Sequence, residues 1–370
     1  MVNEAEYVTE VKAAVLRQQG EPLSLETIRL RRVGPHDVRV RITLTGVCHS
    51  DLSLARGPLD QALPAVLGHE ASGVVVEIGE EVSAVAVGQR VILLWIEPCG
   101  SCFYCSRNES YLCVKTAARN EDPYAIDATG MPIFPGLRVG SFAEETVVPE
   151  NGVVPIPDFV SDAQAALLGC SVTTGVGAVL KAARAEAGSS VLVIGLGGVG
   201  MSVVQGARLA GATTIIGVDR NPEKGRQAES AGLTRFLHAG EDDLKREVRA
   251  LTEGRGADYA FDCVGASATI RDAWNLTRRG GTACIVGIGA RDDVVSFNSL
   301  ELFHQARTLI GTVAGSLESR TDYARFFEWV ADGSLELSSM VTGRGALEDI
   351  DGAFERMARG EGFRTLIEPR

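Results

Sequence analysis

The sequence predicts an α/β protein in which a barrel-like β domain is followed by a doubly wound parallel sheet. Three features predict this arrangement. The chain has 370 residues, more than a single hydrophobic core usually contains. Residues 38–45 alternate between apolar and polar side chains, as in a strand with one face in water. From Ser190 on, strand-like runs, glycine turns and helical stretches alternate, which indicates parallel strands joined by helices.

The first domain is expected to consist mainly of strands. Besides residues 38–45, the apolar runs Gly73–Ile78 and Val91–Ile96 are bounded by Gly, Pro or charged residues and are typical of buried strands. No helical periodicity persists between them, so we expect a barrel whose loops carry a cluster of cysteines. The segment Val114–Gly140 contains several prolines and glycines, and we expect a long irregular loop there.

A helix is expected to link the two domains, because Ser161 and Asp162 can cap an Ala-rich stretch that runs to Lys181. Beyond it we expect strands at Val191–Ile194, Thr214–Asp219, Tyr259–Cys263 and Thr282–Gly287, and helices at Val199–Ala210, at Ala268–Thr277 and from Pro222 onward. After about Gly315 we expect two helices, Tyr323–Ala331 and Ile350–Ala358, and a short terminal strand.

Composition excludes several classes of function. The net charge of −12 and the pI near 5.1 argue against nucleic acid or an anionic membrane surface as a partner. No stretch reaches the roughly 18 uncharged apolar residues that cross a bilayer. The segment Met1–Lys12 lacks the apolar run of a signal peptide. We therefore expect a cytoplasmic protein that acts on a small molecule.

A glycine-rich turn directly follows the expected strand Val191–Ile194 and consists of Gly195, Leu196, Gly197, Gly198, Val199 and Gly200. In this pattern the first glycine permits a tight turn, the second lets a pyrophosphate approach the backbone, and the third allows close helix–strand packing. The helix that follows offers N–H donors and its positive dipole end to the phosphates. The turn therefore predicts a dinucleotide site.

The expected strand Thr214–Asp219 ends in a carboxylate that bears on the choice of dinucleotide. Asp219 stands nineteen residues past Gly200. A carboxylate there accepts hydrogen bonds from the adenosine ribose and repels a 2′-phosphate, which favours NAD over NADP. The neighbouring Arg220 argues in the other direction, because an arginine can accommodate that phosphate.

Four of the eight cysteines lie within fifteen residues: Cys99, Cys102, Cys105 and Cys113. In a cytosolic chain, clustered thiols are interpreted first as metal ligands and only then as disulfides. Four thiolates saturate a tetrahedral zinc ion and leave no open position, so this site is predicted to be structural. An iron–sulfur cluster uses the same donors, but no other electron-transfer feature accompanies them.

Three further potential ligands are dispersed along the chain: Cys48, His69 and Cys170. Taken singly, an isolated cysteine is usually a small core residue, and a lone histidine is usually a satisfied polar group. Cys170, however, lies on the helix expected to link the two domains, and ligand clefts form preferentially between domains.

Together these motifs resemble the medium-chain, zinc-dependent alcohol dehydrogenase family (MDR superfamily), from about Lys12 to the C-terminus. In that family a GroES-like β-barrel domain carries a catalytic zinc and a Rossmann domain binds the coenzyme. The resemblance implies a catalytic domain over residues 1–166 with a structural zinc lobe, completed by residues 316–370. It implies a Rossmann domain over residues 167–315.

The activity that the resemblance implies is reversible hydride transfer between NAD and a primary alcohol or aldehyde, with two zinc ions per chain. The alcohol is bound as a zinc alkoxide. Three residues are expected to ligate the catalytic zinc, with Glu70 behind it as an occasional fourth ligand: Cys48, His69 and Cys170. Asp51 matches the carboxylate that orients the ligand histidine. Ser50 matches the hydroxyl that takes the alcohol proton, and Ser53 stands where some relatives end this proton relay at a histidine.

The resemblance also implies contacts with the coenzyme. His49 and Arg364 match basic residues at the pyrophosphate, although Arg364 is equally compatible with an exposed surface charge. Ile288 is expected on the nicotinamide side, with plain core as the alternative. The remaining expected contacts are Thr174, Lys224, Val264 and Val286.

The substrate pocket is expected to include Ser50, Trp95 and Ile288. A bulky indole at Trp95 would narrow the pocket beside the reacting carbon and favour primary over secondary alcohols. The segment Val114–Gly140 is expected to shape the outer part of the substrate channel.

Several alternatives stay open on the same scaffold. Zinc polyol dehydrogenases typically carry Glu at the third ligand position, where this chain has Cys170. Dehydrogenases of thiol–formaldehyde adducts, S-hydroxymethyl glutathione or its mycothiol equivalent, require a basic pocket mouth, for which Arg119 and Arg138 are candidates. A variant with tightly bound NAD and a non-catalytic nucleotide or redox sensor are further possibilities. A homodimer is expected, with a tetramer as the alternative.

Overall fold

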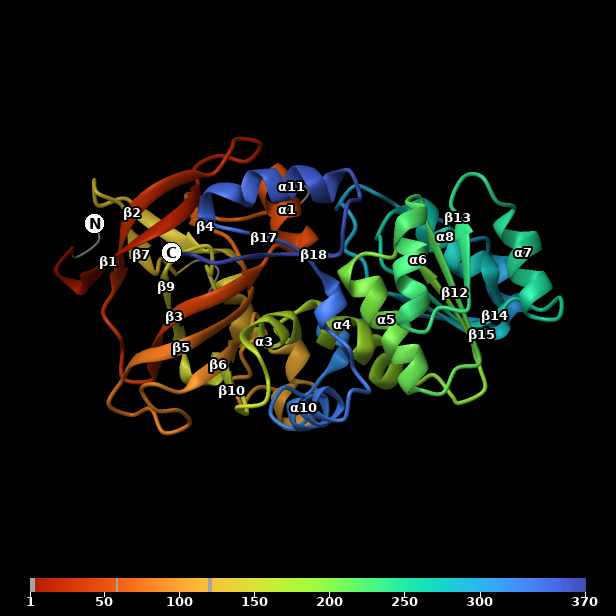
Figure 1. Cartoon of the computed structure of the whole chain (residues 1–370), viewed down its shortest axis with the longest axis horizontal. Coiled ribbons are helices and arrows are strands. Elements are labelled where there is room, and N and C mark those ends of the chain that lie inside the picture. Colours follow the sequence, from red (N-terminus) through yellow and green to blue (C-terminus); the bar gives the residue numbers. More distant parts are fainter. Residues whose placement is uncertain (1–3, 58, 119–121) are drawn as a thin grey trace.

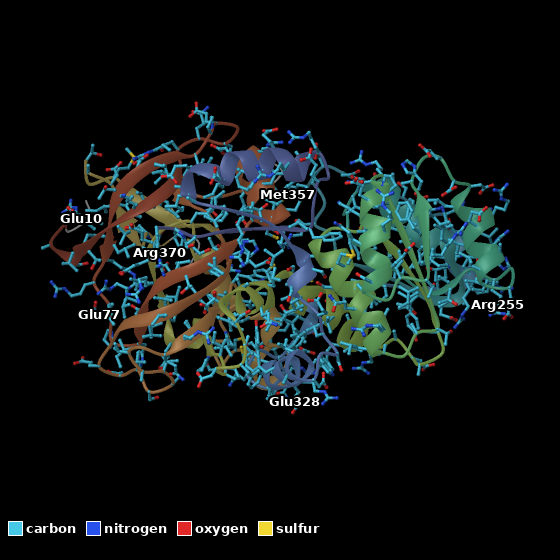
Figure 2. The ribbon with its side chains drawn as sticks, viewed as in Figure 1. Glu10, Glu77, Arg255, Glu328, Met357 and Arg370 are labelled. Atoms are coloured by element: carbon cyan, nitrogen blue, oxygen red, sulfur yellow. The ribbon has the colours of Figure 1, made fainter. Side chains whose placement is uncertain are left out.

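The computed structural model describes residues 4–57, 59–118 and 122–370 and has two lobes (Figure 1). One lobe is built from the N-terminal strands and the returning C-terminal segment, and the other contains the parallel sheet. Figure 2 shows Glu77 towards the far end of the first lobe and Arg255 at the far end of the second. The α/β fold class predicted from the sequence is confirmed.

The first lobe contains a small closed barrel. Its strands, in the order in which they pair, are β1 (Tyr7–Leu16), β2 (Ser24–Arg31), β7 (Ala125–Ile126), β8 (Pro132–Pro135) and β4 (Ala65–Val66). The expectation of a long irregular loop over Val114–Gly140 was therefore wrong in part, because β7 and β8 lie within this segment and complete the barrel. Two-residue and four-residue strands beside Pro and Gly carry too few alternating positions to be detected by periodicity.

A second sheet lies beside the barrel in the same lobe. Its strand order is β10 (Val153–Pro155), β6 (Arg90–Leu93), β5 (Glu70–Ile78), β3 (Asp37–Gly46), β18 (Arg364–Ile367) and β17 (Val341–Gly345), and β9 (Glu145–Pro149) also pairs with β3. The three predicted strands are confirmed, although β6 ends at Leu93 rather than Ile96. The C-terminal strands thus enter the sheet of the N-terminal lobe.

The second lobe is a six-stranded parallel sheet. Its strand order is β13 (Arg235–His238), β12 (Thr214–Asp219), β11 (Ser190–Ile194), β14 (Ala257–Asp262), β15 (Thr277–Ile285) and β16 (Thr308–Gly311). Its helices are α5 (Gly198–Leu209), α6 (Pro222–Ser230), α7 (Leu244–Leu251), α8 (Ser267–Leu276) and α9 (Ser299–Gln305). The strand order reverses between β11 and β14, where such sheets bind ligands at the carboxyl ends of the strands.

The segment that links the lobes is not the single helix expected from Ser161 to Lys181. Ser161 caps α3 (Asp162–Leu168) as predicted, but the chain breaks before α4 (Ser171–Gly177) and the π-helical turn η7 (Ala178–Ala182). The two helical parts are bent by 52°. A Cβ at Gly169 would lie 3.0 Å from the carbonyl oxygen of Ala166 and 3.3 Å from the nitrogen of Ala71, so the break lets the chain pass close to β5.

Among the described residues, this linking pair is also the only candidate for a membrane-spanning segment. No single described helix is long and apolar enough to cross a membrane. Only the bent pair formed by α3 with α4 and η7 has the combined length and apolar composition of a membrane-spanning segment. Most of its side chains are buried in a core that also contains Ile92 of the first lobe and Val191 of the second.

The remaining helices surround the cleft and the C-terminal strands. They are α1 (His49–Arg56), α2 (Val114–Ala118), α10 (Tyr323–Ala331) and α11 (Ile350–Ala358). The short 3-10 turns are η1 (Glu4–Glu6), η2 (Cys105–Arg107), η3 (Ser110–Leu112), η5 (Gly136–Arg138), η6 (Glu150–Gly152), η8 (Ala314–Ser316), η9 (Ser338–Met340) and η10 (Leu347–Asp349). The bounds predicted for α10 and α11 are confirmed. The division at residues 166 and 315 stays a prediction.

Candidate metal centres and dinucleotide site

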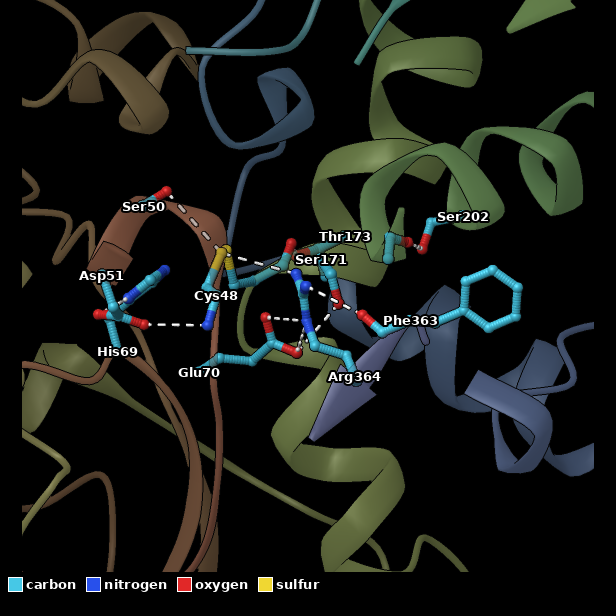
Figure 3. A network of polar contacts seen from close by, with 12 residues as sticks. Cys48, Ser50, Asp51, His69, Glu70, Ser171, Thr173, Ser202, Phe363 and Arg364 are labelled. Carbon is cyan, nitrogen blue, oxygen red and sulfur yellow. Dashed lines mark hydrogen bonds and ion pairs between the residues drawn. The ribbon is translucent and has the colours of Figure 1, made fainter. Parts of the chain in front are cut away.

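Three dispersed side chains come close together: Cys48, His69 and Cys170. Figure 3 shows the polar contacts around Cys48 and His69. Cys48 is the N-cap of α1, His69 immediately precedes β5, and Cys170 occupies the break between α3 and α4. All three are buried, and their sulfur and ring-nitrogen atoms lie within 4.8 Å of one another. Two sulfurs and an imidazole at this spacing fit a tetrahedral zinc ion with one position left for another ligand.

A buried carboxylate orients this cluster. The Oδ1 atom of Asp51 lies 3.0 Å from Nδ1 of His69, and its Oδ2 accepts a hydrogen bond from the backbone N–H of Cys48 at 3.1 Å. The N–H of Gly68 donates to the same carboxylate at 3.0 Å. Because Nδ1 is engaged by Asp51, Nε2 is the ring nitrogen free to bind a metal.

The surroundings of Cys48 favour its thiolate form, which is the form that binds a metal. A hydrogen bond from Cys170, together with the nearby Arg364 and His69, lowers the pKa of Cys48 well below its usual value, although burial opposes this. Metal affinity rises when thiolates are available, because a thiol must lose its proton to bind.

Glu70 and Arg364 form a buried ion pair beside the cluster. The Nε atom of Arg364 lies 3.0 Å from Oε1 of Glu70, and the hydroxyl of Ser171 donates to the same oxygen at 3.0 Å. Burial raises the pKa of Glu70 to about 7, although Arg364 opposes this. Among the described residues, the set of donor atoms within 4.8 Å of one another at this centre does not include Glu70. A fourth-ligand role for Glu70 is therefore not favoured in this arrangement.

Arg364 also reaches the glycine turn. A Cβ at Gly198 would lie 2.8 Å from the guanidinium carbon of Arg364, and Nη2 of Arg364 lies 3.6 Å from Sγ of Cys48. The alternative that Arg364 is an exposed surface charge was wrong, because its side chain is 4 % exposed. Its position at the start of α5 is compatible with the predicted pyrophosphate contact.

The four clustered cysteines form a second potential metal centre. Their sulfur atoms lie within 4.8 Å of one another, in a loop region that contains η2 and η3. Burial acts against ionisation, but backbone N–H groups of Ser101 and Cys102 lower the pKa of Cys99 to about 6. Four sulfurs at this spacing fit a closed, structural zinc site.

The glycine turn has the geometry that a dinucleotide requires. Gly195 has φ of +89°, which permits the tight turn. A Cβ at Gly200 would lie 1.9 Å from the carbonyl oxygen of Gly195, so only glycine lets α5 pack this closely. Nothing lies within 4 Å of a Cβ built at Gly197, which leaves open space in front of the backbone. These features fit a pyrophosphate at the N-terminus of α5.

Asp219 connects the turn to α6. Its Oδ2 accepts from the N–H of Leu196 at 2.7 Å, its Oδ1 accepts from the N–H of Asn221 at 2.9 Å, and Lys224 Nζ lies 3.6 Å from Oδ2. The carboxylate therefore sits where the ribose of a bound dinucleotide is expected. Arg220 is exposed, whereas Lys224 is buried.

The other predicted contacts surround the same cleft. His49 is exposed, Thr174 and Val199 are partly buried and Val286 is buried. Val264 and Ile288 are exposed beyond the carboxyl ends of β14 and β15, so the alternative that Ile288 is a core residue was wrong. Ser50 is partly buried, with Oγ 3.8 Å from Sγ of Cys48, and Ser53 is buried on α1.

Trp95 packs against His69, one of the three potential metal ligands. The two rings meet edge to face, with centroids 6.3 Å apart. Trp95 also lines a cavity of about 30 Å³, together with Thr173 and Tyr323. Of the two basic residues considered for the pocket mouth, Arg138 is buried and donates to the carbonyl of Trp95 at 2.9 Å. Arg119 lies outside the described residues.

Sequence reasoning missed two residues that the structure places at the site. Ser171 holds Glu70, and its position directly after Cys170 was the only available signal. Asn221 contacts the C-terminal segment through Gly360, and nothing in the local sequence indicates this.

Comparisons with known proteins agree with this geometry. Residues 34–158 match the family described as "Alcohol dehydrogenase GroES-like domain", and residues 198–332 match "Zinc-binding dehydrogenase". An S-(hydroxymethyl)glutathione dehydrogenase of Paracoccus denitrificans is 36% identical, over 96% of this chain and 99% of that protein. The chain belongs to the zinc-dependent, medium-chain alcohol dehydrogenase family.

Solved structures support the same membership in this dehydrogenase family. An alcohol dehydrogenase zinc-binding domain protein from Burkholderia ambifaria superposes with a TM-score of 0.92 at 31% identity, covering 98% of this chain and 99% of that one. Benzyl alcohol dehydrogenase from Acinetobacter calcoaceticus superposes with a TM-score of 0.91 at 25% identity, covering 98% and 100%.

Proposed function

We propose that this oxidoreductase transfers a hydride reversibly between NAD and a primary alcohol or aldehyde. The observation that carries the proposal is the buried cluster of Cys48, His69 and Cys170, which offers three ligands. Arg364, which contacts both Cys48 and the glycine turn, links this cluster to the proposed coenzyme site. Three protein ligands are typical of catalytic zinc, and four thiolates of structural zinc, so we propose two zinc ions per chain.

The bound groups supply Lewis acidity, which favours ionisation of the alcohol, and a nicotinamide ring, which accepts the hydride. The chain's own residues bind and orient. Ser50 is positioned to take the alcohol proton, because its hydroxyl lies beside the cluster. Trp95 restricts the space next to the reacting carbon, and Asp51 fixes the orientation of His69.

The coenzyme is proposed to be NAD. Asp219 presents a carboxylate where a 2′-phosphate of NADP would have to lie, and the two negative charges would repel each other. Arg364 lies beside Gly198 at the N-terminus of α5, so the guanidinium group and the helix N–H groups would both contact the pyrophosphate.

Metal content and turnover test this proposal together. We expect two zinc ions per chain and NAD-dependent oxidation of primary alcohols across a panel of aliphatic and aromatic substrates. Cys48→Ser is expected to lose one metal ion and most turnover while it keeps NADH affinity. Cys263→Ser, which changes a cysteine outside both clusters, is the matched control. Normal turnover in Cys48→Ser contradicts the proposal, and absence of turnover in the wild type favours the sensor alternative.

A second candidate, oxidation of a thiol–formaldehyde adduct, is favoured by the relatives. The Paracoccus protein and several other curated relatives carry the name S-(hydroxymethyl)glutathione dehydrogenase. Against it, Arg138 is turned into the protein rather than towards a pocket mouth. Rates with formaldehyde plus glutathione, compared with benzyl alcohol and butanol, separate the two candidates.

We also propose that the protein is a homodimer formed through the edge of the parallel sheet. β16 is the last strand of that sheet, and among the described residues no other strand pairs with its outer side. The adjacent α9 exposes apolar side chains, and Phe303 is 79% exposed. A second copy related by a two-fold axis would cover both features. Light scattering is expected to give a dimer for the wild type and a monomer for Phe303→Glu. A monomeric wild type contradicts the proposed dimer. A tetramer that is unchanged in Phe303→Glu contradicts the proposed interface.

A further inference from the structure

The N-terminus of α6 is hydrogen-bonded to the C-terminal segment across the cleft. The side-chain amide of Asn221 donates to the carbonyl oxygen of Gly360 at 3.1 Å. Asn221 belongs to the parallel-sheet lobe, where its Oδ1 also caps α6 by accepting from the N–H of Glu223 at 3.0 Å. Gly360 lies in the connection between α11 and β18, which belongs to the other lobe.

On one side, this contact adjoins the proposed ribose site. The backbone N–H of Asn221 donates to Asp219 at 2.9 Å, so the same residue touches the carboxylate and the opposite lobe. Lys224, which lies 3.6 Å from Asp219, would be 4.0 Å from a Cβ at Gly360. The loop around Gly360 therefore lies over the ribose end of the dinucleotide site.

On the other side, the same loop leads directly to the catalytic cluster. The N–H groups of Phe363 and Arg364 donate to the hydroxyl of Thr342 at 2.9 and 3.3 Å, which fixes the end of the loop. Gly362 has φ of +65°, and a Cβ there would lie 2.4 Å from Oγ1 of Thr342. Four residues after Gly360, Arg364 contacts Glu70 and Cys48.

We propose that Asn221 is a positioning residue that couples the filling of the ribose site to the placement of Arg364. By holding Gly360, its amide keeps the segment Arg359–Phe363 against the coenzyme site, and this segment carries Arg364 between Glu70 and the glycine turn. The coenzyme then binds to a loop and a pyrophosphate contact that are already in place. This inference rests on the proposed dinucleotide binding.

Removal of the hydrogen bond from Asn221 to Gly360 should therefore weaken coenzyme binding. Without the amide donor, part of the binding free energy must order the loop, so affinity falls. One neutral hydrogen bond corresponds to a change of about 2- to 10-fold in the dissociation constant. At saturating coenzyme the loop is already held, so kcat changes little while KM for the coenzyme rises.

The experiment uses Asn221→Ser in the zinc-loaded protein. Serine retains an acceptor that can cap α6 but has no amide to reach Gly360. Asn298→Ser is the matched control, because Asn298 caps α9 by the same side-chain acceptance from Leu300 and Glu301. NADH affinity is measured by fluorescence titration, and hydrogen exchange is followed in residues 359–364 with and without NADH.

The expected result is weaker NADH binding by about 2- to 10-fold and faster exchange in residues 359–364 for Asn221→Ser but not for Asn298→Ser. Unchanged NADH affinity in Asn221→Ser overturns the inference. Weaker affinity with normal exchange in residues 359–364 also overturns it, because the effect then arises within α6. A wild type that does not bind NADH at all contradicts the proposed function itself.

Discussion

The guanidinium group of Arg364 pairs with the carboxylate of Glu70 across 294 residues of sequence, with both side chains buried and Nε 3.0 Å from Oε1. The pair joins the first residue of β18 to the first residue of β5, two strands of one sheet, next to His69, which immediately precedes β5. Few positions in the chain link so many parts of the site.

Removal of the guanidinium should be costly for this reason. In Arg364→Met, Glu70 becomes a buried carboxylate whose remaining side-chain partner is Ser171. We expect a loss of about 3–5 kcal/mol in the free energy of unfolding, as is typical when one partner of a buried pair is removed. Urea unfolding of the zinc-loaded variants measures it.

The double variant Glu70→Gln/Arg364→Met should recover part of that loss, because no unpaired charge remains buried. Arg359→Met, which removes an exposed partner of Glu361, is the control and should change stability little. A single Arg364→Met variant as stable as this control would contradict the explanation.

Replacement of Trp95 by alanine should widen the substrate range. The indole lies edge to face with the ring of His69 and also lines a cavity of about 30 Å³, so its removal enlarges the space beside His69. We expect kcat/KM for secondary alcohols to rise by about 10-fold or more relative to primary alcohols, the scale on which a pocket discriminates small differences in shape. For Trp95→Phe, this ratio should lie between the ratios of the wild type and of Trp95→Ala. An unchanged ratio in Trp95→Ala would show that the indole does not set this preference.

Asp219 provides the test of coenzyme choice. Asp219→Asn keeps one oxygen that can accept from the N–H of Leu196 or of Asn221, loses the acceptor for the other, and removes the charge that repels a 2′-phosphate. We expect the ratio of kcat/KM with NAD to that with NADP to fall by about 10-fold, equivalent to 1.4 kcal/mol. Asp219→Ser, which also loses reach, should weaken NAD further. Preference of the wild type for NADP would reverse this prediction.

Local sequence was sufficient for many elements in the second half of the chain. The glycine turn at Gly195, the start of α5 and the bounds of α10 follow from short-range patterns of small, apolar and capping residues. The cysteine lobe was likewise predictable, because its four ligands are close in sequence and need only a loop to wrap them.

Long-range features were not predictable in this way. The break at Gly169 arises because the linking segment passes close to Ala71, and nothing between Ser161 and Lys181 records that contact. The pairing of Arg364 with Glu70 depends on β18 entering the sheet of the other lobe, which periodicity within four residues cannot show. The meeting of Cys48, His69 and Cys170 was inferred from a family resemblance rather than from spacing.

The hairpin that completes the barrel offers a pH-dependent test of stability. Asp127 accepts hydrogen bonds from the N–H and hydroxyl of Thr129 at 2.8 and 2.7 Å and from the N–H of Met131 at 3.0 Å. Arg17, which follows β1, lies 2.8 Å from its other oxygen. Burial alone would raise the pKa of Asp127, but these donors outweigh it and lower the pKa to about 2.

The sign of the pH dependence follows from that lowered value. The unfolded chain binds a proton near pH 4 whereas the folded chain does so near pH 2, so the contribution is complete above pH 4 and is lost as the pH falls towards 2. We expect Asp127→Asn to cost about 1–3 kcal/mol at pH 7, with the difference from wild type shrinking below pH 4. Urea unfolding of both proteins across pH 7 to 3 measures the difference, in which any common effect of metal loss cancels. A difference that stays constant down to pH 3 would show that the carboxylate charge is not what holds the hairpin to Arg17.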